Sequence, residues 1–527
     1  LRSLVLNCCF CFKISFLIKM FSAFARIFII LFAVGVYGST NHHPIVHIKD
    51  TKLIGSLHKN HQVEMFLGLP FAVPPIGDLR WEKPVPWVPE SNKKIIANKF
   101  KPACIQNQRI VNWYKRLILD FGGDPEDLDV PVFSEDCLYL NLWRQKGSKN
   151  NLPVIVYIHG GSNKAGWSYE PNYLGHNIAN KGFILISIPY RLGVFGFFSH
   201  PDIENPNLAL YDQILALEWI QEYITFFGGD PSNVTLVGES AGAGGISHLI
   251  ASPLSKDLFH KAVHQSGGSS FTYPTLGADV RKLANNFANS FKDPSIKNLK
   301  NISSEEILKV SEEVYAEHYF NYVDDNSSLI GDLSDAYKSG NVQNVDLLIG
   351  SNNDEWSLYY DGNVNIGLWL DQETTPEKKI KLLELLDDIN DPIRKMDLLI
   401  TAKNFVCPSL FMAKELKKKG GKTWVYQFNR VRDNELAKKY GAFHGAELPY
   451  VFDTHDEWLP TNETDKVLTE EIQSYWLAFA KTGDPNNDNA VLWPKYDSSD
   501  DSTLVLDQEI YQRSHESSEI CKIMDLF

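Results

Sequence analysis

The sequence is poor in basic residues, and it has no long apolar run after its first 38 residues. Its 51 lysines and arginines are outnumbered by 65 aspartates and glutamates, so the formal charge is −14. An acidic surface of this size argues against nucleic acids and anionic membranes as partners. Because a membrane span needs roughly 20 apolar residues, we also expect no stable membrane anchor in the rest of the chain.

Patterns typical of cofactor sites are missing as well. The sequence contains no glycine-rich phosphate loop and no Cys/His spacing of a metal site, and the pair His42-His43 is too short to count. We therefore expect neither a metal nor a cofactor. No internal repeat or low-complexity linker divides the 527 residues, of which 44% are hydrophobic and 22% charged. This composition is typical of a globular protein with one large core.

The first methionine is Met20, and the residues after it have the pattern of a secretory signal peptide. A basic residue precedes an apolar run over residues 27–36, and small residues then lead to Ser39. The run is too short for a membrane anchor. We expect translation to start at Met20, residues 1–38 to form a leader, and residues 39–527 to form a single secreted, extracellular domain. The sequence leaves the oligomeric state open.

Cysteines and glycosylation sequons fit an oxidising secretory route, which predicts at least one disulfide. Four of the seven cysteines follow the leader, and they allow three full pairings. These cysteines are Cys104, Cys137, Cys407 and Cys521. The candidate glycosylation sites are Asn233, Asn301, Asn326 and Asn462.

Short apolar, β-branched runs alternate with helical patterns along the chain. Helical spacing of apolar positions marks residues 208–226 and 468–481. This alternation predicts an α/β fold with a large, mostly parallel central sheet flanked by helices. The polar stretch 293–340 predicts an excursion from the sheet. The predicted buried strands span residues 154–158, 183–188, 234–237, 347–349 and 423–428.

The most informative motif is Gly-x-Ser-x-Gly around Ser240. It lies between the strand predicted over residues 234–237 and a small-residue helix that runs to about residue 250. This is the pattern of a nucleophile elbow, in which Gly238 and Gly242 allow a strained turn that lifts the serine hydroxyl clear of the sheet. The bare motif also suits an ordinary glycine-lined turn. The strand before it and the helix after it favour the nucleophile.

A serine nucleophile needs a base that takes its proton, and the hydrolase order along the chain is serine, acid, histidine. His444 lies in a glycine-flanked loop after a predicted strand, where such a sheet places catalytic groups. His248 lies on the helix after the elbow, where it suits a surface or packing role. Glu355 and its neighbour Asp354 both follow a predicted strand, and spacing alone does not separate these two acids.

Two segments are expected to supply backbone N–H groups to a developing oxyanion. Gly160-Gly161-Ser162 directly follows the strand predicted over residues 154–158, and Ala241 follows the serine. A tight turn is the alternative interpretation of the glycine pair. Since such donors are worth about 2.7 to 4 kcal/mol each, we predict that the amides of Gly161, Ser162 and Ala241 form an oxyanion hole.

Together these motifs resemble the type-B carboxylesterases, the family that includes cholinesterases, liver-type carboxylesterases and insect esterases. The resemblance covers nearly the whole chain after the leader and includes five motifs besides the elbow. They are residues 66–72 (FLGLPFA), 134–141 (SEDCLYLN), 190–197 (YRLGVFGF), 227–231 (FGGDP) and 479–485 (FAKTGDP).

The resemblance implies an α/β-hydrolase fold in which insertions form an active-site gorge, and a small-molecule carboxylic ester as substrate. It assigns Ser240 as the nucleophile, Glu355 rather than Asp354 as the acid, and His444 as the base. It further implies structural pairs: a disulfide between Cys104 and Cys137, with Cys407 and Cys521 free or paired together, and the ion pairs Arg80–Glu135 and Arg191–Asp212.

Two departures from the family pattern concern the site. Ser162 replaces the usual glycine or alanine of the oxyanion loop, and its Cβ limits the conformations of that loop. Asn163 and Lys164 follow it where an aromatic or apolar pair is common. Trp356 replaces the glycine that usually follows the acid, so its ring either crowds the acid or lines the gorge.

We therefore expect a secreted serine carboxylesterase that works through an acyl-enzyme. A juvenile hormone esterase is the first alternative, although such members usually carry Gln where this chain has Glu239. An acetylcholinesterase is less favoured, because segments like that of Trp87 also occur in non-choline esterases. A non-catalytic binding protein is disfavoured by the complete triad. Activity is expected to decline as the pH falls through roughly 6 to 7, because a protonated His444 cannot act as a base.

Overall fold

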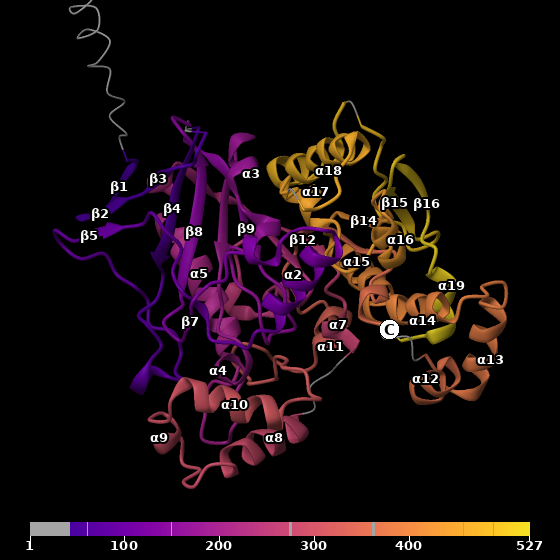
Figure 1. The fold of residues 1–527 in the computed structure, drawn as a ribbon, viewed down its shortest axis with the longest axis horizontal. Helices are drawn as coiled ribbons and strands as arrows, with labels where there is room; N and C mark the ends of the chain where they lie inside the picture. Colours follow the sequence, from indigo (N-terminus) through magenta and orange to yellow (C-terminus); the bar gives the residue numbers. More distant parts are fainter. Residues whose placement is uncertain are drawn as a thin grey trace, which may run out of the picture. The chain divides into compact units, whose positions relative to one another are not determined.

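The computed structural model describes residues 43–60, 62–148, 150–272, 277–360, 364–456, 458–488 and 490–526. From Pro44 onward the chain forms one compact unit, drawn as a ribbon in Figure 1. The leader expected over residues 1–38 lies outside the described residues.

In the described residues the centre of the fold is an 11-stranded mixed sheet with the order β16-β15-β14-β13-β12-β11-β9-β10-β8-β4-β3. The inner strands from β10 to β15 are parallel. They are β10 (Ile184–Ile188), β9 (Leu152–Ile158), β11 (Gly229–Glu239), β12 (Lys261–Gln265), β13 (Asp346–Asn352), β14 (Thr423–Phe428) and β15 (Ser502–Leu506). The antiparallel edge strands are β8 (Tyr139–Gln145), β4 (Val63–Pro70), β3 (Ser56–Leu57) and β16 (Tyr511–Ser514).

All five predicted strands are present, as β9, β10, β11, β13 and β14. Strand β12 was missed, because its sequence carries Lys261, His264 and Gln265 and shows no apolar run. The side chains of His264 and Gln265 are nevertheless fully buried. Their polar atoms find partners in other elements: Ser247 Oγ lies 2.9 Å from His264 Nε2, and Gln265 Nε2 donates to Glu447.

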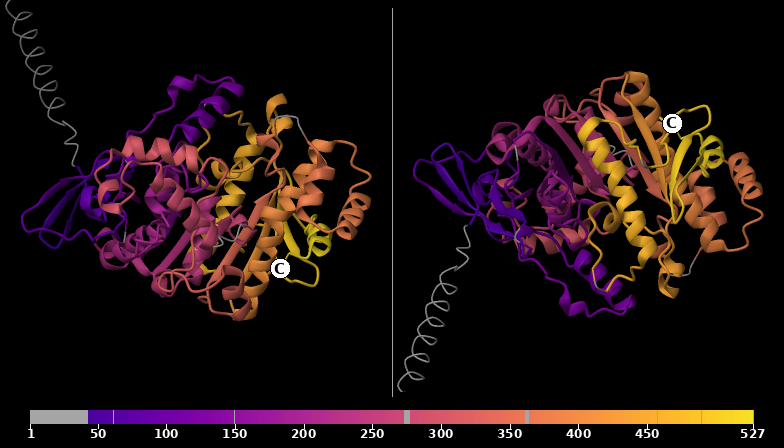
Figure 2. Two further views of the ribbon diagram at one scale, coloured as in Figure 1. Left: turned by 90° about the horizontal axis from the view of Figure 1, so that it is seen from below. Right: turned by 90° about the horizontal axis from the view of Figure 1, so that it is seen from above.

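Helices cover both faces of the sheet, as the views from below and from above in Figure 2 show. Side chains alternate between the faces with the two-residue period of a strand: in β9, Val156 and Ile158 pack in one core cluster, and Ile155 and Tyr157 in another. The first cluster includes residues of α5 (Leu208–Tyr223), α6 (Ala241–Ala251) and α15 (Cys407–Lys419); the second includes residues of α3 (His176–Asn180), α17 (Leu448–Phe452) and α18 (Glu463–Thr482).

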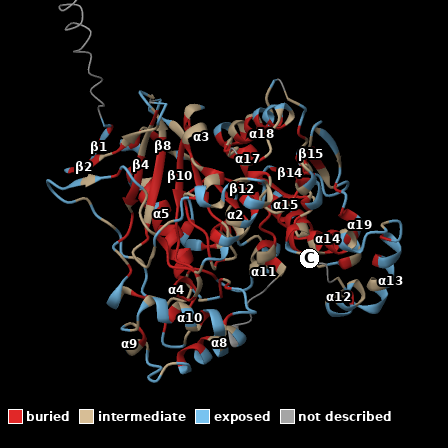
Figure 3. Ribbon diagram, viewed as in Figure 1, coloured by how far each residue is buried: buried red, intermediate tan, exposed pale blue. Residues whose placement is uncertain are grey.

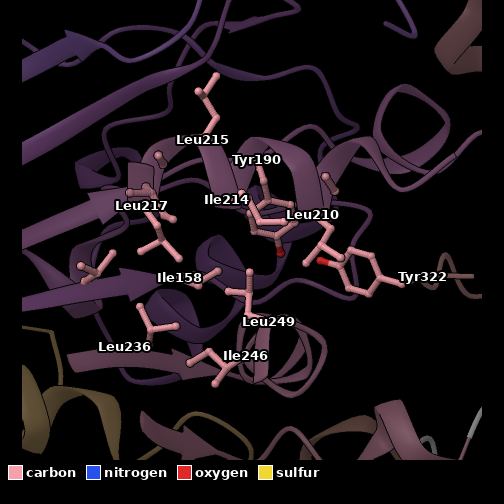
Figure 4. Packing of buried hydrophobic residues seen from close by; sticks show 14 of the residues in the cluster. Ile158, Tyr190, Leu210, Ile214, Leu215, Leu217, Leu236, Ile246, Leu249 and Tyr322 are labelled. Atoms are coloured by element: carbon pink, nitrogen blue, oxygen red, sulfur yellow. The ribbon is translucent and has the colours of Figure 1, made fainter. Parts of the chain in front are cut away.

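The packing under the elbow is a dense aliphatic layer. Figure 4 shows Ile158 and Leu236 of adjacent strands against Ile214 of α5 and Ile246 and Leu249 of α6. Figure 3 shows that the central strands and these helices are the most buried parts of the chain, whereas the outer helices expose much of their surface. The elbow therefore adjoins fully buried core side chains, and protein cores have low compressibility.

The excursion predicted over residues 293–340 is helical and lies outside the sheet (Figure 1). Within it are α9 (Ile296–Leu299), α10 (Ser304–Val314) and α11 (Leu333–Ser339). Further elements are β1 (Ile45–Ile48), β2 (Thr51–Ile54), β5 (Lys94–Ile96), β6 (Ala103–Cys104), β7 (Phe133–Ser134), α2 (Arg109–Asp120), α4 (Gly193–Gly196), α7 (Ser269–Thr272), α8 (Gly277–Asn289), α12 (Ile366–Glu373), α13 (Pro376–Leu385), α14 (Pro392–Thr401), α16 (Glu435–Tyr440) and α19 (Ser518–Met524).

One continuous helical segment, Pro392–Lys419, is long and apolar enough to cross a membrane by length and composition alone. It consists of α14, a π-helical turn (Ala402–Val406) and α15. In its most apolar window, 94% of the residues are buried inside the protein. This is the burial of a core helix.

The structure contains the disulfide implied by the family resemblance, Cys104–Cys137, with a Cα–Cα distance of 4.9 Å. The second pair is also closed: Cys407 of α15 bonds to Cys521 of α19. Both expected ion pairs are formed. Arg80 contacts Glu135 at 2.5 Å and Arg191 contacts Asp212 at 2.8 Å, and all four side chains are at least nine-tenths buried.

Candidate active site

Ser240 occupies the turn between β11 and α6, in a backbone conformation that residues other than glycine rarely adopt (φ 54°, ψ −126°). The flanking glycines make this turn sterically feasible. A Cβ atom on Gly238 would lie 2.7 Å from the carbonyl carbon of Gly242, and one on Gly242 would lie 2.0 Å from the carbonyl oxygen of Ile158. Strained backbone of this kind typically marks functional sites, and the geometry is that of a nucleophile elbow.

The ring of His444 lies between two carboxylates. Its Nδ1 is 2.6 Å from Oε2 of Glu355, and its Nε2 is 3.1 Å from Oε1 of Glu239. Phe405 of the π-helical turn packs against the same ring, with 5.3 Å between ring centroids. The orientation of the imidazole is therefore fixed from three sides.

The structure brings Glu355, and not Asp354, to the histidine. Glu355 is fully buried, and its Oε1 accepts a hydrogen bond of 2.7 Å from the amide of Asn352. Asp354 points elsewhere: it forms an ion pair with Arg394 and accepts a 2.8 Å hydrogen bond from the amide of Ala442. Asp354 thus ties down the loop that leads to His444.

Ser240 and His444 line the same cavity, although in the described residues no hydrogen bond joins them. Nε2 is instead turned toward Glu239, the residue directly before the serine. Hydrogen bonds between a serine and its base are often long or misaligned in sites without substrate.

The electrostatics of this group follow from burial and from the short distances. Burial raises the pKa of the Glu239 carboxyl, whereas the charge of His444 acts in the opposite direction and favours the carboxylate. Burial by itself would lower the pKa of His444, but the charges of Glu239 and Glu355 outweigh it and raise the pKa of His444 above its ordinary value. The imidazolium form is thus favoured in the resting site.

The turn after β9 supplies N–H groups beside the serine. Gly161 has φ 106° and Ser162 has φ 59°, so the serine accepts the left-handed region despite its Cβ. Ala241 is the first residue of α6. Within the described ranges the amides of Gly161, Ser162 and Ala241 donate no hydrogen bond, and all three residues line the cavity with Ser240. This arrangement suits an oxyanion hole.

Comparison with known proteins identifies the family of the chain. The model of the carboxylesterase family matches residues 42–387 and 371–523. The chain belongs to the carboxylesterase family. A para-nitrobenzyl esterase of Bacillus subtilis (strain 168) is 33% identical over 497 residues, covering 90% of this chain and 97% of that protein. Human carboxylesterase 5A is 33% identical over 482 residues, covering 82% of this chain and 80% of the relative.

Solved structures support the same assignment. A PNB esterase superposes with a TM-score of 0.79 at 29% identity, covering 92% of this chain and 99% of that chain. A thermophilic PNB esterase gives 0.79 at 30% identity, covering 92% of this chain and 100% of that chain. The protein thus has the α/β-hydrolase fold. As a member of the carboxylesterase family it is a carboxylic ester hydrolase, and its family acts on small-molecule esters.

The carboxylesterase cavity encloses about 450 Å³, and much of its wall comes from elements that the sequence did not connect with the site. Trp356 lines the cavity, and its amide donates to Asp397 at 2.9 Å. Of the two roles expected for its ring, crowding the acid or lining the gorge, the structure shows the second. Helix α2 and the π-helical turn carry no motif signal. Wall residues from these and other segments include Arg109, Trp113, Arg116, Tyr319, Phe320, Tyr359, Asn404 and Phe405.

Glu447 is a second residue that sequence reasoning missed. It is buried, accepts hydrogen bonds from Gln265 at 2.8 Å and from Asn352 at 2.6 Å, and so links β12 to β13 beneath the histidine loop. The sequence signal that could have identified Glu447 is its position three residues after His444. His248 has the packing role expected: its Nδ1 lies 2.8 Å from the carbonyl oxygen of Gly244. In the described part of the chain, no group of three or more His, Cys, Asp or Glu side chains is arranged to hold a metal ion.

Proposed function

We propose that the protein is a secreted serine carboxylesterase with Ser240 as nucleophile, His444 as base and Glu355 as the orienting acid. The observation that carries this proposal is the 2.6 Å contact between Nδ1 of His444 and the fully buried carboxylate of Glu355. A buried carboxylate at this position fixes the tautomer of a catalytic histidine and stabilises its charged form. The strained turn at Ser240 gives further support.

Hydrolysis then proceeds in two acyl transfers. Nε2 of neutral His444 takes the proton of the Ser240 hydroxyl as Oγ attacks the ester carbonyl carbon, and the oxyanion accepts hydrogen bonds from the amides of Gly161, Ser162 and Ala241. The imidazolium returns the proton to the leaving alcohol. In the second transfer His444 takes a proton from a water, whose oxygen attacks the acyl carbon. The imidazolium then returns the proton to Oγ of Ser240 as the carboxylic acid leaves.

A fluorophosphonate probe tests this proposal directly, because it reacts covalently with an activated serine. We expect stoichiometric labelling of Ser240 in the wild-type protein. Ser240→Ala should be folded and unlabelled. A folded wild-type protein that takes up no probe would overturn the enzyme proposal in favour of a non-catalytic binding protein.

Among substrate classes, general carboxylic esters are favoured over choline esters. The candidate choline-stacking residue, Trp87, packs edge-on against Tyr223 with 6.1 Å between ring centroids. Trp87 is absent from the described lining of the cavity. Juvenile hormone is the alternative substrate. Glu239 argues against it, because juvenile hormone esterases usually carry Gln at this position. Turnover of short p-nitrophenyl esters, acetylthiocholine and juvenile hormone distinguishes the three, and a clear preference for either of the last two would reverse this order.

Secretion is supported by the two disulfides. Of the four sequons, Asn301 and Asn326 are exposed. The other two are only partly exposed: Asn233 donates to the carbonyl of Lys481, and Asn462 caps α18. We expect glycans on Asn301 and Asn326 first. Expression in insect cells followed by deglycosylation and mass spectrometry tests this, and unglycosylated, cell-retained protein would contradict secretion.

A further inference from the structure

The oxyanion turn holds an unusual backbone that its own sequence does not favour. Ser162 and Asn163 both have positive φ angles, 59° and 57°. For Ser162 this region costs roughly 1 to 2 kcal/mol, whereas asparagine tolerates it more readily, so neighbouring structure must hold Ser162 in place. The contacts that do so involve Asn163 and Lys164, which follow Ser162 where the family commonly has an aromatic or apolar pair.

Lys164 reaches from this turn to the end of a distant helix. Its Nζ donates hydrogen bonds to the carbonyl oxygens of Tyr315, at 3.0 Å, and Ala316, at 3.4 Å. Tyr315 is the C-cap residue of α10. Carbonyl groups at a helix C-terminus lack helical partners and carry partial negative charge, so a cation there is favoured.

Asn163 makes a second link to the same segment. Its Nδ2 donates to the carbonyl oxygen of Phe320 at 2.9 Å, and its own carbonyl accepts from the amide of Gly193 at 2.7 Å. Phe320 lines the cavity. The chain from residue 315 to residue 320 is therefore joined at both ends to the turn that carries the Gly161 and Ser162 amides.

Lys164 lies partly out of water. Burial, and after it the charge of Arg109, lower its pKa, whereas Glu317 acts in the opposite direction. Hydrogen bonds to a desolvated amine are harder to replace by water than bonds to an exposed one. The contact of Lys164 with the end of α10 is therefore a structural contact and not an interaction of a fully exposed side chain.

We propose that Lys164 is a positioning residue for ester hydrolysis, which fixes the oxyanion turn by anchoring it to the C-terminal end of α10. The side chain acts through the backbone of Ser162 and Gly161 and does not touch the substrate. This inference rests on the proposed function, because it presumes that those amides bind the oxyanion. Displacing such donors by about 1 Å is enough to cost up to a hundred-fold in rate.

The test compares Lys164→Met with a matched control, Lys419→Met. Lys419 also donates to the C-cap carbonyl of a helix, Gly340 of α11, at 2.8 Å, but it is the last residue of α15 and does not belong to the oxyanion turn. We expect Lys164→Met to lower kcat on p-nitrophenyl esters about ten-fold or more with little change in KM, since the oxyanion forms only in the transition state. Lys419→Met should keep the wild-type kcat.

Two further readouts separate positioning from a general loss of structure. Affinity for a trifluoromethyl ketone, which forms a tetrahedral adduct with the serine, should fall in Lys164→Met by the same factor as kcat/KM. Lys164→Arg should recover most of kcat. A folded Lys164→Met protein with kcat within two-fold of wild type, or an arginine variant as slow as the methionine variant, would overturn the inference.

If Lys164→Met does not fold, Asn163→Asp is judged by the same criteria. Aspartate also tolerates positive φ, but it loses the donor to Phe320. Absence of both turnover and fluorophosphonate labelling in the wild-type protein would instead defeat the proposed function, and this inference with it. A wild-type enzyme that is active while both variants match the control defeats the inference alone.

Discussion

Nε2 of His444 lies 3.1 Å from Oε1 of Glu239, the residue that directly precedes Ser240 in the chain. In the proposed mechanism the serine proton must arrive at this same nitrogen. The Glu239 carboxylate beside Nε2 favours a proton on this nitrogen, and so it competes with the function of His444 as a base. The contact therefore has direct consequences for the pH dependence of the enzyme.

The first prediction concerns the pH profile. Since Glu239 and Glu355 together raise the pKa of His444 above its ordinary value, the neutral base should become abundant only above the range of 6 to 7 expected from an unperturbed histidine. We expect kcat/KM to keep rising above pH 7. Glu239→Gln removes one of the two charges, lowers the pKa of His444 and moves the acid limb of the profile to lower pH.

Measuring kcat/KM from pH 5 to 10 checks this prediction. The comparison uses the activity at pH 6 of each protein relative to its own plateau. This relative activity should be about ten-fold higher in Glu239→Gln than in the wild type for each pH unit by which the acid limb is displaced. Glu218→Gln, which alters an exposed acid of α5, serves as the control and should keep the wild-type profile. Identical profiles for all three proteins would contradict the role given to Glu239.

The second prediction separates the two neighbouring acids. Glu355→Gln keeps the shape of the side chain but reverses the hydrogen bond to Nδ1 of His444 or leaves it unmade, so we expect kcat to fall about 10⁴-fold, as with other triad acids replaced by amides. Asp354→Asn weakens the ion pair with Arg394. It should keep most of kcat and lower the free energy of unfolding by about 1 to 3 kcal/mol.

Steady-state kinetics and urea unfolding of the two variants give the answer. The assignment fails if Asp354→Asn is the inactive variant, or if Glu355→Gln keeps more than a tenth of the wild-type kcat.

The third prediction concerns the steric basis of the elbow. A Cβ atom on Gly242 would lie 2.0 Å from the carbonyl oxygen of Ile158, which cannot move without displacing β9. We expect Gly242→Ala to destabilise the protein by about 3 kcal/mol and to abolish fluorophosphonate labelling. In the same helix, a Cβ on Gly244 meets its nearest neighbour at 3.5 Å, so Gly244→Ala should be neutral or slightly stabilising.

Thermal melting and labelling of both alanine variants check this. Equal melting temperatures for the two would show that the elbow tolerates a side chain at position 242 and would remove the steric explanation for the motif.

The fourth prediction concerns the second disulfide. Cys407 directly follows the π-helical turn that carries Phe405, which contacts His444, and its partner Cys521 is 114 residues away. The chain-entropy model gives about 4 to 5 kcal/mol for a loop of this length. The double variant Cys407→Ser, Cys521→Ser should lose stability of this order and lose activity at lower temperature than the wild type.

Urea unfolding and residual activity after heating measure both effects. An unchanged unfolding midpoint would contradict a structural contribution from the Cys407–Cys521 bond. Unchanged heat inactivation despite lower stability would instead separate the bond from the active site.

Local features of this protein could be predicted because their causes are local. The strand predicted over residues 423–428 coincides with β14, and the Gly-x-Ser-x-Gly motif forms the strained turn at Ser240. Burial and steric clashes between residues close in sequence suffice for such elements. Strand β12 was missed for the opposite reason, since its buried polar side chains are satisfied by partners from other parts of the chain.

The composition of the candidate site divides in the same way. The sequence by itself determined the serine, the glycine turn and the histidine loop, because each is a short motif attached to a strand. Spacing left Glu355 and Asp354 open, and the family resemblance implied Glu355. Only the tertiary structure brings Glu355 to His444, places Glu239 against Nε2, and joins Lys164 to the C-terminal end of α10. These contacts join residues 89 to 205 positions apart, and such distances are set by how helices and strands pack, which no local pattern records.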